Sequence, residues 1–282
     1  MPPAPSPLFA SVALAARIER AECGLLASGV EVAGRRRPDE GAFALPIAGG
    51  VATWARRESP LDKVAGLGFA GVPDDAELDA VERAFAERDT PVRVELATLG
   101  DPAVATALGR RGYLPAGFEN VLGRPLEATP APAAPAGISV SRSDEAELSL
   151  WLDVVVDGFA HPDEQGVASD EEFPREVLER VIGDLSRGAG FGRYLARRDG
   201  EPAGGAGLRV DQGVAQLCGA ATLPAHRRCG IQSALLAARL AAAASAGCDL
   251  AVVTTQPGSK SQQNAERQGF ALLYVRAVFV RD

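Results

Sequence analysis

The two halves of this 282-residue sequence repeat one order of helices and strands, and this repeat restricts the possible folds more than any other feature. In each half the pattern predicts a helix, a buried strand, a second helix that ends at glycine, and a long strand that opens with an aromatic residue. Gly112 and Gly269 lie 157 positions apart, and the strand centres Val94 and Val252 lie 158 apart. The shared spacing indicates duplication of one α/β unit, and the alternative is a chance match between common elements.

The repeated elements are predicted at matching places along the chain. In the first half they are a helix at 75–87, a strand at 92–96, a helix at 102–111 and a strand at 113–122. In the second half they are a helix at 231–246, a strand at 249–255, a helix at 259–268 and a strand at 270–280. Further signals predict an opening helix in each half (8–27 and 145–159), a β-hairpin built from 194–197 and 204–210, and a strand at 214–223.

The segment 127–137, with the sequence EATPAPAAPAG, separates these halves. Alternating alanine and proline can form neither a helix nor a central strand, so the segment is typical of an extended spacer. The sequence therefore predicts a first domain at 1–126, a linker at 127–137 and a second domain at 138–282.

Composition restricts the partners and the compartment. Acidic residues outnumber basic ones, 37 to 29, and the net charge of −8 argues against nucleic acid as the main partner. The apolar stretch near the N-terminus is interrupted by charged residues between Arg17 and Glu22, so neither a signal peptide nor a membrane-spanning helix is predicted. The cysteines show no C-x-x-C pairing and, with two histidines, no zinc pattern, which favours a reducing cytoplasm and no bound metal. These cysteines are Cys23, Cys218, Cys229 and Cys248.

A basic loop stands between a predicted strand and the start of the helix at 231–246. The strand ends near Leu223, Arg227 and Arg228 follow, and Gly230 directly precedes the helix. The first turn of a helix exposes unpaired N–H groups with a partial positive charge, glycine allows a close approach to the backbone, and arginine binds phosphate with two donors. The loop is therefore a candidate site for a pyrophosphate.

The same loop carries a family resemblance. Arg227-x-x-Gly230-Ile231-Gln232 resembles the R/Q-x-x-G-x-G/A signature of the GNAT superfamily of acyl-CoA-dependent N-acetyltransferases. The preceding strand, the following helix, strand and helix, and then Gly269-Phe270 stand in the order of that family, over about 138–282. The resemblance implies two GNAT-like α/β domains in tandem, each a mixed, mostly antiparallel sheet flanked by helices.

The resemblance also implies a binding site for acetyl-CoA. Gln232 departs from the signature, where glycine or alanine is usual, but a longer side chain can point away from the phosphates. The residues that the resemblance assigns to the cofactor are Thr222, Leu223, Arg227, Arg228, Cys229, Gly230, Ile231, Gln232, Ser233 and Asn264. For Asn264 the alternative role is that of a cap or turn residue.

The groups that would move protons do not carry over from the family. Many GNAT enzymes have a tyrosine four residues before the Gly-Phe pair as a general acid, and here that position is Ala265. The strand at 214–223 carries no carboxylate in place of the glutamate base of other members. Tyr274 is a candidate proton donor by its chemistry alone, and the alternative is a structural tyrosine in a half-buried strand.

The first half resembles the same fold but lacks the basic loop. At the equivalent place it has Gly71-Val72-Pro73-Asp74-Asp75, where two acids stand at the start of a helix and would repel a pyrophosphate. Residues 66–71 match G-x-G-x-x-G, a dinucleotide-binding motif, but the helix begins only after Pro73. We therefore expect a degenerate domain that binds neither acetyl-CoA nor a nicotinamide cofactor, with Asp74 as the helix cap.

The resemblance implies an N-acetyltransferase that moves an acetyl group from acetyl-CoA to an amine of a small molecule or peptide. It also implies that the amine attacks the thioester directly, without a covalent enzyme intermediate. The alternative is a non-catalytic module that binds acyl-CoA as a sensor, since the usual tyrosine is missing. Neither nucleic acid nor a membrane is an expected partner.

Overall fold

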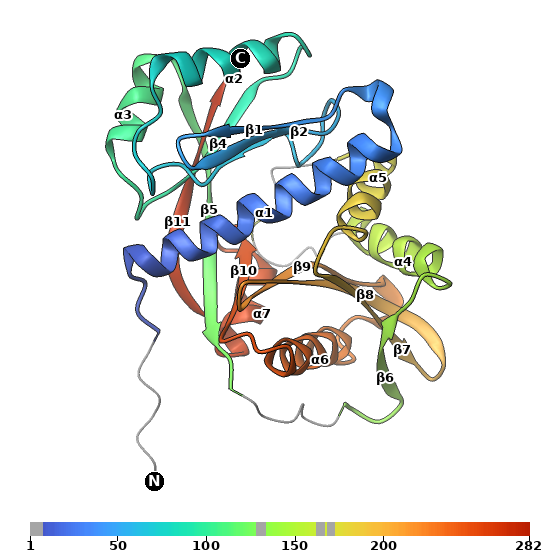
Figure 1. Ribbon diagram of the computed structural model, residues 1–282. Helices are drawn as coiled ribbons and strands as arrows, with labels where there is room; N and C mark the ends of the chain where they lie inside the picture. Colours follow the sequence, from blue (N-terminus) through green and yellow to red (C-terminus); the bar gives the residue numbers. More distant parts are fainter. Residues whose placement is uncertain (1–7, 128–133, 162–166, 168–172) are drawn as a thin grey trace.

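A computed structural model describes residues 8–127, 134–161, 167 and 173–282 of the chain. Its eleven strands form one continuous sheet in the order β1-β2-β3-β4-β11-β5-β10-β9-β8-β7-β6, flanked by helices (Figure 1). All neighbouring strands are antiparallel except two parallel pairs, β3 with β4 and β9 with β10. The predicted class, a mixed and mostly antiparallel α/β protein, is confirmed.

The elements of the first half follow the predicted order. The helices are α1 (Val12–Arg36), α2 (Asp75–Ala86) and α3 (Ala103–Arg110), with a short 3-10 helix η1 (Pro38–Glu40) after α1. The strands are β1 (Phe43–Ile47), β2 (Gly50–Trp54), β3 (Lys63–Ala65), β4 (Val92–Ala97) and β5 (Leu114–Pro125). The sequence did not predict β1 and β2.

The second half repeats this order from β7 onward. Its helices are α4 (Leu148–Ala160), α5 (Arg175–Leu185), η2 (Pro224–His226), α6 (Ile231–Ser245) and α7 (Lys260–Arg267). Its strands are β6 (Ile138–Ser143), β7 (Phe191–Arg198), β8 (Glu201–Asp211), β9 (Val214–Thr222), β10 (Leu250–Thr255) and β11 (Ala271–Arg281). The series β7-β8-β9-α6-β10-α7-β11 matches β1-β2-β3-α2-β4-α3-β5, and β6 extends the second series by one strand.

Local hydrogen bonds support the predicted equivalence of Gly112 and Gly269. Both glycines have a left-handed backbone, with φ of 86° and 82°. The N–H of Tyr113 donates to the carbonyl of Leu108, and the N–H of Phe270 donates to that of Ala265, again with the same offset. Glycine avoids the steric cost of this conformation, so each helix can end sharply before a buried aromatic residue.

The last strand of each half lies beside the sheet of the other half. β11 pairs with β4, and β5 pairs with β10, while β5 and β11 pair with each other at the centre. Residues 157 positions apart are equivalent in the two halves. Asn120 pairs with Val275, and their equivalents, Ala277 and Phe118, also pair with each other. Glu119 and Arg276 are equivalent to each other and form a pair at the centre. The two units are therefore related by approximate twofold symmetry about Glu119 and Arg276. Sequence patterns predicted the strands, but not that the last strand of each half pairs with the sheet of the other half.

Helices cover both faces of the sheet. On β5, Val121 packs with Ala15 of α1, whereas the next residue, Leu122, packs with Ile231 of α6. Neighbouring residues of a strand point to opposite faces, so α1 and α6 lie on opposite sides of the sheet. On β8, Gly204 lies against α6 and Gly205 lies against α4, which places α4 on the face of α1.

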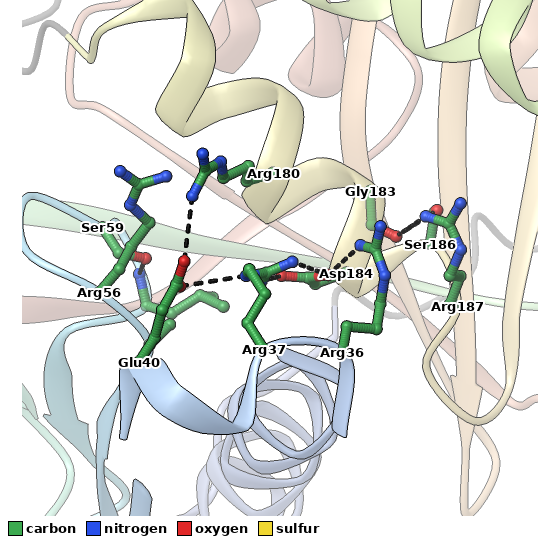
Figure 2. A network of polar contacts seen from close by, with 12 residues as sticks. Arg36, Arg37, Glu40, Arg56, Ser59, Arg180, Gly183, Asp184, Ser186 and Arg187 are labelled. Atoms are coloured by element: carbon green, nitrogen blue, oxygen red, sulfur yellow. Dashed lines mark hydrogen bonds and ion pairs between the residues drawn. The ribbon is translucent and has the colours of Figure 1, made fainter. Parts of the chain in front are cut away.

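Helix α1 crosses both halves (Figure 1). Ion pairs join its C-terminal end to the second half. Figure 2 shows Arg36 and Arg37, at the end of α1, binding the buried carboxylate of Asp184 on α5. Glu40 follows α1 and accepts a hydrogen bond of 3.1 Å from Arg180, also on α5. A buried carboxylate requires such partners, so this network fixes the orientation of α1 against the second half.

Candidate acetyl-CoA site

A gap opens between the parallel strands β9 and β10. The strands pair only at Val214–Leu250, Ala215–Ala251 and Gln216–Val252. Beyond these pairs β9 continues to Thr222 and β10 continues to Thr255 without mutual hydrogen bonds. The backbone groups of β9 that face β10 after Gln216 are therefore available to a ligand.

A bulge in β9 helps to separate the strands. Gly205 of β8 lies opposite Ala221, whereas Gly207 lies opposite Cys218, so β9 carries an extra residue here. Gly219 takes a φ of +45° within the bulge, a conformation that suits glycine. Behind it, the buried Arg239 of α6 donates a hydrogen bond of 2.9 Å to the carbonyl of Gly207. No sequence pattern indicates the role of Arg239, because its hydrogen-bond partner Gly207 lies on a distant strand.

The basic loop leads from the end of β9 to an uncapped helix. Arg228 and Gly230 have positive φ angles, 60° and 89°, which turn the chain sharply into α6. Gly230 is the N-cap of α6, no side chain caps the helix, and its first turn contains no acid. The N–H groups of this turn and the helix dipole therefore favour an anion at this place.

Three arginines lie at or beside the loop. Arg228 is exposed, and Arg227 donates a hydrogen bond to the carbonyl of His161. Arg198, at the end of β7, lies 3.0 Å from the sulfur of Cys229 through its Nη1 atom. The sequence did not predict Arg198, because β7 reaches the loop only in the folded sheet.

The remaining predicted residues lie at the end of β9, in the first turn of α6 and, for Asn264, in α7. Thr222 ends β9 and has a buried hydroxyl without a hydrogen-bond partner among the described residues. Ile231 is buried in the core and anchors α6, Gln232 is half-buried and Ser233 is exposed. Asn264 lies in α7, whose N-cap is Ser259, so Asn264 is not the cap of this helix. Leu223 is half-buried between β9 and η2.

Tyr274 lies on the other face of the sheet, beneath α1. Its hydroxyl is buried and donates a hydrogen bond of 2.7 Å to Glu19, which also accepts from Arg276 at 2.8 Å. Burial and the Glu19 carboxylate raise the pKa of Tyr274, so its proton is held at Glu19. This placement matches the structural alternative, and a role for Tyr274 as a proton donor to the leaving thiolate stays a prediction.

Cys218, on the part of β9 that borders the gap, is not a nucleophile at neutral pH. Burial, followed by the charge of Glu22, raises the pKa of its thiol to about 12. Among the described residues no three histidine, cysteine or acidic side chains converge as metal ligands do.

The equivalent place in the first half is closed. β3 ends at Ala65, the second of its two residues that pair with β4, so β3 does not extend beyond the pairing as β9 does. A backbone hydrogen bond joins the loop after β3 to the segment after β4: the N–H of Asp101 donates to the carbonyl of Gly68 at 2.9 Å. Asp74 caps α2 in a capping box with Glu77, as predicted, and so occupies N–H groups that a phosphate would need.

Comparisons with known proteins agree with this geometry. Residues 158–270 match the model of the Acetyltransferase (GNAT) family. The sequence finds no significant match among curated proteins. In the part of the chain that the structure describes, no helix is long and apolar enough to cross a membrane.

Several solved structures share the fold over nearly the whole chain. A GCN5-related N-acetyltransferase from Kribbella flavida is 20% identical with a TM-score of 0.62, over 90% of this chain and 95% of that chain. One from Sphaerobacter thermophilus is 15% identical with a TM-score of 0.58, over 94% and 93%. A tandem GNAT protein from the clavulanic acid biosynthesis pathway is 14% identical with a TM-score of 0.59, over 98% and 97%. Residues 158–270 are thus similar to the GNAT family of acetyltransferases, and the chain as a whole shares the fold of a tandem GNAT protein.

Proposed function

We propose that the chain transfers an acetyl group from acetyl-CoA to an amine of a small molecule or peptide, and that the cofactor binds in the second half. The observation that carries this proposal is the gap between β9 and β10, which opens directly beside the uncapped start of α6. The family match of this segment supports the same activity.

Each part of the site has a distinct task in this proposal. The first-turn N–H groups of α6, with Arg227, Arg228 and Arg198, bind the negatively charged phosphates. The unpaired backbone groups of β9 after Gln216 bind the amide groups of the pantetheine arm, as a neighbouring strand would. Backbone N–H groups near the bulge at Gly219 stabilise the oxyanion that forms when an amine attacks the thioester carbonyl.

The loop composition explains why only the second half takes the cofactor. In the first half Asp74 and Glu77 cap the equivalent helix, and Gly68 is bonded to Asp101 where the gap would be. We therefore propose that the first half is a degenerate copy that binds neither acetyl-CoA nor a nicotinamide cofactor.

Release of CoA in the presence of amines tests the activity. The intact chain with acetyl-CoA should release free thiol when a panel of primary amines is added, faster than acetyl-CoA alone. Arg227→Ala with Arg228→Ala should lose most of this rate, because two charge-assisted phosphate contacts are removed. The matched control is Arg35→Ala with Arg57→Ala, which removes the same charge from exposed ion pairs elsewhere.

Binding of acetyl-CoA without thiol release for any amine would support the sensor alternative instead. The absence of both binding and release would contradict the acyl-CoA assignment itself.

A further inference from the structure

An ionic cluster lies at the centre of the sheet, beneath α1, and is separate from the basic loop before α6. At its middle the Nε atom of Arg276 is 2.8 Å from Glu19, and the Nη atoms lie 3.7 to 3.8 Å from carboxylate oxygens of Glu22, Glu95 and Glu119. Lys63 forms an ion pair of 2.5 Å with Glu95. We call these six residues the central cluster; they are Glu19, Glu22, Lys63, Glu95, Glu119 and Arg276.

The cluster holds more negative than positive charge. When all of these groups are ionised, four carboxylates face two cations, Arg276 and Lys63, and Arg93 adds a third cation 3.8 Å from Glu95. Glu19 and Glu95 are almost fully buried, yet one oxygen of each, Oε2, has no hydrogen-bond partner among the described residues. The unpartnered oxygen of Glu95 lies 3.8 Å from Arg276, inside the cluster. A buried carboxylate oxygen without a donor is costly, so the cluster can accept a further cation.

The cluster opens to solvent on one side only. The side chains of Glu22 and Glu119 are 16% and 21% exposed, whereas those of Glu19 and Glu95 are 1% exposed. Thr254, on β10, is exposed at the same edge and lies 3.5 Å from Arg276 through its hydroxyl. Glu22, Glu119 and Thr254 therefore form the open edge of the cluster.

This open edge lies where β9 and β10 separate. Gln216, the last paired residue of β9, donates a hydrogen bond of 3.2 Å to Glu22. Thr255, the last residue of β10, pairs with Asn120, so Glu119 follows directly beyond the end of β10. The edge faces α1, on the side of the sheet opposite α6 and the basic loop. A thioester that passes through the gap from the α6 side would emerge beside Glu22 and Glu119.

We propose that Glu22 and Glu119 bind the ammonium group of the acceptor, so that the substrate is a cationic amine and the first half of the chain supplies its binding site. Glu22 comes from α1 and Glu119 from β5, both within residues 8–127. This inference rests on the acetyltransferase function proposed above. On this proposal the first half contributes to the site, because it provides the carboxylates that bind the acceptor and that β9 lacks.

An ammonium ion fits the cluster better than a metal ion or an anion. No three of the described acidic side chains converge as ligands of a metal ion would. An anion would be repelled by the excess of carboxylates. Burial, and then the charge of Glu95, raises the pKa of Glu119 to about 7, so this carboxyl group holds a proton part of the time at neutral pH. A bound ammonium group would lower this pKa and displace a proton from Glu119 near pH 7.

Calorimetry with a simple diamine tests the proposal without knowledge of the natural acceptor. The intact chain, saturated with CoA at pH 7, is titrated with 1,4-diaminobutane, and with butanamide as an uncharged control. We expect the diamine to bind with release of protons, measured in two buffers of different ionisation enthalpy, and butanamide not to bind. Glu22→Gln and Glu119→Gln should each weaken diamine binding about tenfold or more, as expected for loss of a charge-assisted contact.

Two further variants make the result specific. Glu201→Gln removes an exposed carboxylate outside the cluster and should leave diamine binding unchanged. Thr254→Lys places an ammonium group at the exposed edge without disturbing buried residues, so it should abolish diamine binding even if a glutamate variant folds poorly.

The outcomes separate this inference from the proposed function. All variants should still bind acetyl-CoA, because the basic loop before α6 lies on the other face of the sheet. Absence of diamine binding, or equal binding in the Glu22, Glu119 and Thr254 variants, would contradict the proposal and leave the cluster as a contact between the halves. Absence of acetyl-CoA binding in the intact chain would instead contradict the proposed function.

Discussion

Tyr274 and Glu119 lie on the same face of the central strands, and their surroundings give them different tasks. The hydroxyl of Tyr274 is buried against Glu19, in a closed part of the central cluster. Glu119 lies at the open edge, next to the gap between β9 and β10. Position in the folded sheet, rather than residue type, therefore decides which of these groups can meet a substrate.

At the residue scale, we expect Tyr274→Phe to affect stability more than activity. The variant leaves the buried Glu19 with one donor fewer, which should lower the free energy of unfolding by about 1–2 kcal/mol. Tyr194→Phe is the matched control, because this buried tyrosine makes no hydroxyl hydrogen bond to a described residue, and it should change stability by less than about 0.5 kcal/mol. Chemical denaturation measures both. A fall in turnover of roughly 10²-fold or more in Tyr274→Phe would restore this residue as a general acid.

At the scale of elements, local patterns and long-range pairing were predictable to different degrees. Helices α2, α3, α6 and α7 and strands β4, β5, β10 and β11 were expected within a few residues of their bounds, since periodicity and terminal glycines are local signals. The basic loop before α6 was expected for the same reason. The exchange of β5 and β11, and the meeting of Glu22 with Gln216, depend on contacts between residues far apart in sequence, which no local pattern encodes.

The capping box of α2 tests whether helix capping alone excludes the cofactor from the first half. Asp74→Ala should lower the free energy of unfolding by about 1 kcal/mol, because the first turn of α2 loses its cap. The variant should still not gain an acetyl-CoA site there, since β3 ends at Ala65 and Gly68 remains bonded to Asp101. Thermal unfolding with and without acetyl-CoA measures both effects, and Asp153→Ala, an exposed change within α4, is the control. A second binding event in Asp74→Ala would contradict the closed geometry.

At the scale of the whole molecule, the two halves form one sheet, and we propose a single cofactor site, in the second half. Strand exchange and the ion pairs between α1 and α5 join the halves, while the basic loop and the open gap occur only in the second half among the described residues. The division at 1–126, 127–137 and 138–282 remains a prediction, and residues 128–133 of the expected linker lie outside the described residues. The sequence also predicted a cytoplasmic protein, and no finding here bears on that prediction.

The stoichiometry of acetyl-CoA binding, measured by calorimetry, tests this account most directly. We expect one acetyl-CoA per chain. Arg227→Ala with Arg228→Ala should weaken this binding by about tenfold or more, in keeping with the loss of charge-assisted contacts to phosphate. Arg35→Ala with Arg57→Ala should leave it unchanged. Two sites per chain, or one site that keeps its full affinity when Arg227 and Arg228 are replaced, would show that the cofactor does not bind at the start of α6.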